Sequence, residues 1–113
     1  MRLGNILKNL KEDQEVTISI AEVEYTGTVE YQSYSESTKD PVSPWYDPGG
    51  VTLLIDLDQN TVEELDLEIT TLRVTCGQFE DFPRWKTPVG ALYEDGEEKT
   101  ELGDVTDIQT DDQ

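Results

Sequence analysis

The apolar residues at the start of the chain follow a helical period. They stand at positions i, i+3, i+4 and i+7, as Leu3, Ile6, Leu7 and Leu10. This spacing places them on one face and predicts an amphipathic helix from about residue 3 to residue 11. A helix of about two turns is not stable alone in water, so we expect this face to lie against another part of the protein.

The period then changes to two, which is typical of half-buried strands. Residues 16–20 place apolar side chains at even positions, and residues 23–31 place them at odd positions. A bulge or a tight turn near Ala21–Glu22 would account for this change of parity. Gly27 weakens the second strand unless the strand bends sharply or another segment passes close to it.

Three further strands are predicted downstream, at residues 51–57, 62–69 and 72–76. In the second of them Leu65, Leu67 and Ile69 would face inward, and Asp58-Gln59-Asn60 would form the turn before it. The segment 79–93 has no clean period and predicts an edge strand or a packed arm.

A long loop is expected at residues 33–50, which contain three prolines and two glycines. Loops of this length are often functional or mobile. Trp45 and Tyr46, at its centre, would form either a binding tip or a lid over an open end of the core.

These elements predict a mainly β protein: a small, strongly bent, five-stranded barrel-like sheet with one short N-terminal helix. One β-rich domain would span residues 1–93. Residues 94–113 contain nine acids, one lysine and few apolar anchors, so we expect a disordered acidic tail.

The chain is strongly acidic, which bears on the solvent and the partners expected for it. The sequence has 26 Asp and Glu against 8 Lys and Arg, for a formal net charge of -18 in 113 residues. The tail and the rest of the chain are both acidic, as in proteins of salt-loving archaea, where molar salt shortens the Debye length to about 3 Å and screens self-repulsion. A dedicated acidic binding surface and an unusual mesophilic protein are the alternatives.

The start of the predicted sheet resembles a known family. A short helix, then Val16-Thr17-Ile18-Ser19-Ile20, a turn and Tyr25-Thr26-Gly27-Thr28-Val29 resemble the opening of the Sm-like proteins, over residues 3–79 at most. The resemblance implies a small bent barrel. In that family, rings bind RNA through an Asp and Asn pair after the second strand and an Arg-Gly step near the last strands. Here the long loop and Cys76-Gly77 stand in those places, so the resemblance does not extend to the RNA-binding residues.

The residues that carry most catalytic chemistry are scarce. The sequence has no His and one cysteine, Cys76, which we interpret as a small buried hydrophobe, with a reactive thiol or an intermolecular disulfide as the alternatives. Residues 56–60 begin like a calcium loop, but Thr61 and Leu67 stand where the turn glycine and the bidentate Glu belong. We therefore expect no metal and no cofactor.

Nucleic-acid binding would need clustered basic residues. Arg84 and Lys86 flank Trp85 in a predicted interaction arm, but two cations do not outweigh -18, which argues against direct nucleic-acid binding. The opposite role is mimicry of DNA by carboxylates at alternate strand positions, in the two ladders Glu22, Glu24, Glu30 and Glu64, Asp66, Glu68.

The sequence therefore predicts a non-catalytic protein-interaction module from a salt-adapted cytoplasm. Its partner would be another protein or a second copy, bound through exposed strand edges or the apolar face of the N-terminal helix. A DNA mimic that inhibits a nucleic-acid-binding protein is the alternative, and an enzyme that uses carboxylates is a third hypothesis. We expect no membrane span, since no apolar run approaches about 18 residues.

Overall fold

The computed structural model describes residues 3–35, 38–39, 46–47, 49–78 and 85–110. In these residues two helices and eight strands follow one another as α1 (Leu3–Asn9), β1 (Glu15–Ile20), β2 (Val23–Ser35), β3 (Thr38–Lys39), β4 (Tyr46–Asp47), β5 (Gly50–Leu57), α2 (Gln59–Leu65), β6 (Thr71–Gly77), β7 (Val89–Glu94) and β8 (Glu97–Thr110).

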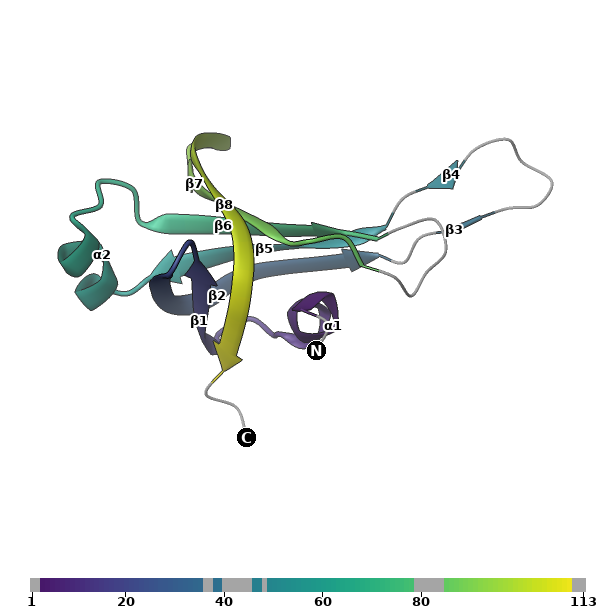
Figure 1. Cartoon of the computed structure of the whole chain (residues 1–113), viewed down its shortest axis with the longest axis horizontal. Helices are drawn as coiled ribbons and strands as arrows, with labels where there is room; N and C mark the ends of the chain where they lie inside the picture. Colours follow the sequence, from purple (N-terminus) through teal and green to yellow (C-terminus); the bar gives the residue numbers. More distant parts are fainter. Residues whose placement is uncertain (1–2, 36–37, 40–45, 48, 79–84, 111–113) are drawn as a thin grey trace.

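Across these described ranges, six strands close into an antiparallel barrel in the order β1-β2-β5-β6-β7-β8, with β8 returning to β1. The small β-barrel class is therefore confirmed, with one strand more than expected. Figure 1 shows β2, β5 and β6 as long strands lying side by side, with α2 at one end, the β3–β4 pair beyond the other, and β8 crossing the barrel.

The interior is filled by the inward residues of every barrel strand. Burying these side chains is the main favourable term for a fold of this size. The fully buried ones include Val16, Ile18, Ile20, Val29, Leu53, Ile55, Leu72 and Val74. Helix α1 and the residue after it, Leu10, complete the core, because Leu7 and Leu10 are buried while Leu3 and Ile6 pack against it. The predicted apolar helix face thus lies on the barrel.

The predicted change of parity is a tight turn between β1 and β2. Ala21 and Glu22 both have positive φ, 51° and 67°, as a two-residue hairpin turn requires. At Gly27 another segment passes close to the strand, which is one of the two reasons predicted for a glycine at this position. A Cβ there would clash with the carbonyl oxygen of Asp56, so β5 can approach β2 only because the side chain is absent.

The predicted strand at 62–69 is wrong, and so is the turn at 58–60. Residues 59–65 form α2, because Asp58 caps it: its Oδ1 accepts a hydrogen bond from the Thr61 amide at 2.9 Å. The helix ends at Asp66, which has φ 54°. The alternation of Leu65, Leu67 and Ile69 came from the end of this helix and the coil that follows, where all three pack against the core.

The predicted disordered tail is also wrong, because residues 97–110 form β8 and close the barrel. Val105 and Ile108 are buried in the interior, and the strand pairs with β7 along its first part and with β1 along its last. Pairing and burial together offset the ordering entropy. Its acids are exposed to solvent, so their repulsion does not prevent the strand from forming.

Two other predicted boundaries shift. Strand β2 runs to Ser35 and β5 begins at Gly50, so strand residues occupy both ends of the predicted 33–50 loop, and β3 and β4 pair within it. In the 79–93 segment, β7 is a barrel strand between β6 and β8 and not an edge. Neither helix in the described part of the chain is long and apolar enough to cross a bilayer.

Candidate interaction face

Part of the outward surface of β2, β5, β6 and β7 carries no carboxylate, although Glu24, Glu30, Asp56 and Glu94 are exposed elsewhere on these strands. Strand pairing aligns the residues of this part in three rows across the sheet. We call this surface the acid-free face, and its residues are Ser35, Gly50 and Gly77 in the first row, Ser33, Thr52, Thr75 and Val89 in the second, and Tyr31, Leu54 and Arg73 in the third, which ends at the buried Ala91. In a chain with 26 acids, a continuous outer surface of this kind is the feature that most needs a physical explanation.

A shallow hollow of about 310 Å³ lies in this face, between the ends of β2, β5 and β6. Small residues surround the hollow, and at one of them, Gly50, a larger residue would not fit. A Cβ at Gly50 would lie 2.7 Å from the Cys76 carbonyl oxygen, so the hollow follows from the close approach of β5 and β6. The side chains of Tyr31 and Val89 stand out of the same face, with exposed fractions of 46% and 36%.

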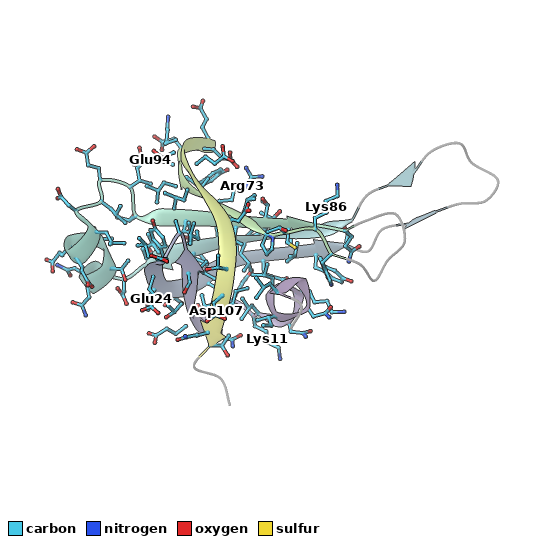
Figure 2. The ribbon with its side chains drawn as sticks, viewed as in Figure 1. Lys11, Glu24, Arg73, Lys86, Glu94 and Asp107 are labelled. Carbon is cyan, nitrogen blue, oxygen red and sulfur yellow. The ribbon has the colours of Figure 1, made fainter. Side chains whose placement is uncertain are left out.

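Charged side chains lie at the borders of the acid-free face. The one charged member, Arg73, forms an ion pair with Glu98 at 3.1 Å and lies 5.6 Å from the centre of the Tyr93 ring. Figure 2 shows Arg73 on the side of β7 and β8, near Glu94, while Glu24 lies at the end of the barrel where α2 packs. Arg73 thus has a carboxylate partner, and the exposed Lys86 lies at another border of the face, where its Cδ would be 3.4 Å from a Cβ at Gly77.

The opposite electrostatic character is found between the β1–β2 hairpin and α2. An open cavity of about 550 Å³ there is lined by Ser19, Glu22, Val23, Glu24, Thr26, Thr61, Glu64 and Leu65. Its three carboxylates are exposed to solvent. Within the described ranges, no group of three or more acidic, Cys or His side chains is arranged to hold a metal ion. The cavity is therefore an acidic depression with no built metal site.

One of the two predicted acidic ladders is not a ladder. Glu64 lies in α2, and Asp66 and Glu68 lie in the coil after it, so they do not have the spacing of alternate strand positions. Glu22 lies in the hairpin turn, while Glu24 and Glu30 lie on β2. The DNA-mimic hypothesis stays a prediction, but these six acids do not form two parallel ladders in one sheet, as it had assumed.

The predicted interaction arm is partly described. Trp85 is half-buried, and its Nε1 donates a hydrogen bond to Asn5 Oδ1 at 2.9 Å. Its ring lies so close to Gly4 that a Cβ there would clash with it, and the Tyr34 ring centre is 6.1 Å away. Trp85 thus connects this segment to α1. Lys86 is exposed, and Arg84 lies outside the described residues.

The predicted loop-tip pair, Trp45 and Tyr46, is described only in part. Trp45 lies outside the described residues, and of Tyr46 the structure describes the backbone, which belongs to β4. The acid-free face was missed in the sequence. Its signal was the absence of acids at the outward positions of residues 31–35, 50–54 and 73–77, which becomes one surface only when the strand register is known.

Cys76 is the buried small hydrophobe that the sequence predicted. Its exposed fraction is 2%, and its Sγ donates to the Lys86 carbonyl oxygen at 3.2 Å. Burial raises the pKa of the Cys76 thiol to about 11. Because the thiolate is the nucleophilic form, this thiol is unreactive at neutral pH.

Comparison with known proteins adds no relative. No family model, no curated protein and no solved structure matches this chain. The resemblance to Sm-like proteins and to proteins of salt-loving archaea therefore stays a prediction.

Proposed function

We propose that this protein is a non-catalytic interaction module that docks another protein surface on the acid-free face. The observation that supports this most directly is the exclusion of carboxylates from three adjacent rows of outward positions on β2, β5, β6 and β7. A purely solvated surface has no need of such an exclusion, because each of these positions could carry an acid as easily as the neighbouring strands do.

The cost of desolvation explains why a docking surface excludes carboxylates. A carboxylate placed in an interface must lose its water and find a partner, and it costs free energy when it finds none. Ser, Thr and Gly present few flexible atoms, and Tyr is one of the residue types enriched at binding surfaces. Tyr31 and Val89 add exposed apolar area to this face.

The acids elsewhere support the second part of the proposal, which is that the protein works in concentrated salt. They are exposed and lie on β8, on α2, on the β1–β2 hairpin and at the remaining outward positions of β2, β5 and β7. At low ionic strength they would repel any acidic partner over long distances, whereas in molar salt the repulsion extends about 3 Å. The acid-free face can then approach a partner at close range.

A non-catalytic role agrees with the chemistry of the described residues. The sequence has no His, and the Cys76 thiol is buried and protonated at neutral pH. We therefore assign the exposed residues of the acid-free face to binding, with no cofactor.

The experiment compares three versions of the full chain, immobilised in about 1 M potassium chloride, where charges are screened beyond about 3 Å. Ser33→Glu adds one carboxylate to the centre of the face at an exposed position, and Gln109→Glu adds the same charge on β8, outside the face. Proteins retained from a high-salt extract of the source organism are quantified by mass spectrometry.

We expect at least one protein, which can be the chain itself, to be retained by the wild type and by Gln109→Glu but not by Ser33→Glu. If retention is the same on all three versions, the face is not the docking surface and the proposal is wrong.

A further inference from the structure

The acid-free face contains both a hollow and a protruding side chain, which is what self-complementarity requires. The hollow is bordered by Ser33, Ser35 and Thr52, and Tyr31 projects from the same strand, β2. Ser35 lies four positions after Tyr31 in the extended strand, which corresponds to about 13 Å. We infer that the occupant of this face is a second copy of the chain, docked about a twofold axis. This inference rests on the proposed function and names its partner.

The charge of the face favours a second copy over other occupants. A basic partner would bind more strongly to the exposed carboxylates elsewhere on the molecule, and an acidic partner would need free cations. The face has no carboxylate, its member Arg73 is paired with Glu98, and one further cation, Lys86, lies at its border beside Gly77. The matching surface must be nearly uncharged too, and among the described residues a second acid-free face is such a surface.

Repulsion restricts how two copies can meet. Each copy carries a formal charge of -18, and like charges placed opposite each other across an interface cost several kcal/mol. Contact through β8, α2 or the β1–β2 hairpin would bring carboxylates against carboxylates, whereas contact between two acid-free faces keeps them at the border.

The shape of the face fits the same arrangement. Two sheets pack face to face about 10 Å apart when the side chains between them interdigitate. A twofold axis makes every contact twice, so Tyr31 of each copy would enter the hollow of the other. A side chain at Gly50 would meet the Cys76 carbonyl oxygen, so this border of the hollow requires glycine.

The size of the face sets the strength of the dimer. Four strands about 4.8 Å apart and three rows about 6.6 Å apart cover roughly 400 Å² on each copy. A standard interface covers about 800 Å² per partner, so this dimer belongs to the weak and transient class. We expect a dissociation constant between about 10 μM and 1 mM in molar salt, and a weaker dimer in dilute buffer, where repulsion is long-ranged.

Sedimentation equilibrium of the full chain tests this directly, at protein concentrations from about 1 μM to 1 mM in about 1 M potassium chloride. We expect the wild type to shift from monomer to dimer over this range. Ser33→Glu places two carboxylates near the axis and should weaken the dimer at least about tenfold. Tyr31→Ala removes the protruding ring and should weaken it about tenfold.

The control variant is Gln109→Glu, which should dimerise within about twofold of the wild type because it lies on β8, opposite Thr17 of β1. Circular dichroism verifies that each variant is folded. If Ser33→Glu does not fold, Tyr31→Ala decides, since that side chain is already half exposed.

A wild type that stays monomeric at about 1 mM, or a Ser33→Glu variant that dimerises like the wild type, would overturn the inference. A monomeric wild type that still retains another protein through the face would leave the proposed function standing and exclude the second copy. Loss of all face-dependent retention would reject both.

Discussion

Two walls of the same barrel carry opposite surfaces. The acid-free face of β2, β5, β6 and β7 presents hydroxyls, glycines and Tyr31, while the wall formed by β8 presents mostly acids. Their inner sides are alike: Leu53 on the first wall and Ile108 on the second are both buried. The acidic surface is therefore independent of the interior, and net charge alone does not indicate which segments fold.

The comparison also separates two roles of surface composition. Exposed carboxylates keep the protein soluble and prevent nonspecific contacts at the price of self-repulsion. A surface that must lose its water in a complex works best without them. On this protein the two requirements are met on different walls, which is why the acid-free face identifies a docking surface more clearly than any single residue does.

The largest effect should come from the interior of each wall. Leu53→Ala and Ile108→Ala each remove a buried side chain, with exposed fractions of 0% and 6%, and each should lower the free energy of unfolding by about 2–4 kcal/mol. Urea titrations in molar salt measure both. Equal losses would show that the acidic wall is as well packed as the acid-free wall.

The exposed Gln109→Ala serves as the control and should change the free energy of unfolding by less than about 0.5 kcal/mol. A loss below about 1 kcal/mol for Ile108→Ala, beside a large loss for Leu53→Ala, would mean that β8 is only loosely attached to the barrel.

The second effect tests whether water reaches the barrel interior behind the acid-free face. Burial raises the pKa of Cys76 from 9.0 to about 11, so in alkaline solution the unfolded chain loses this proton first. The stabilisation is fully present below pH 9.0 and is lost as pH rises through about 11. The free energy of unfolding should fall by about 2–3 kcal/mol over this window.

Cys76→Ala should remove this part of the pH dependence, as measured by urea titrations between about pH 8 and 11. Burial also raises the pKa of Tyr25, and its loss of stability in alkali would remain in both proteins. Identical pH profiles for the wild type and Cys76→Ala would show that the thiol is hydrated and the wall is open.

The third effect concerns an acid that has a structural role. Asp58 caps α2 through the Thr61 amide, and Asp58→Ala should cost about 1 kcal/mol. Asp58→Asn keeps a good cap and should cost much less. Thermal unfolding in molar salt compares the two. If Asp58→Ala unfolds like the wild type, the cap contributes nothing and Asp58 belongs with the solvated acids.

Local sequence patterns predicted the elements whose signals are local. The helix at α1, the strands β1, β5 and β6 and the turn at Ala21–Glu22 each follow from a periodicity within a few residues. The signal for α2 was also local, since Asp58 followed by Thr61 is a helix N-cap pattern, but the alternation of Leu65, Leu67 and Ile69 masked it.

The remaining features depend on contacts between distant residues. Strand β8 is stabilised by pairing with β1, about 90 residues earlier in the chain, which no local count of charges can reveal. Trp85 is positioned by Asn5 across 80 residues of sequence. The acid-free face can be identified only when the register of four strands is known. The sequence contains its residues but does not show that they lie close together.

The smallest effect should come from the acids that define the contrast between the walls. Glu22, Glu24 and Glu64 share one open cavity, and replacing all three by Gln should raise the free energy of unfolding in dilute buffer by a few tenths of a kcal/mol per residue. The gain should vanish in about 1 M potassium chloride, because it arises from screened repulsion. Urea titrations at both salt concentrations measure the difference. A triple variant that is less stable at both concentrations would show that these carboxylates stabilise the fold, and the acidic surface could then no longer be treated as independent of the interior.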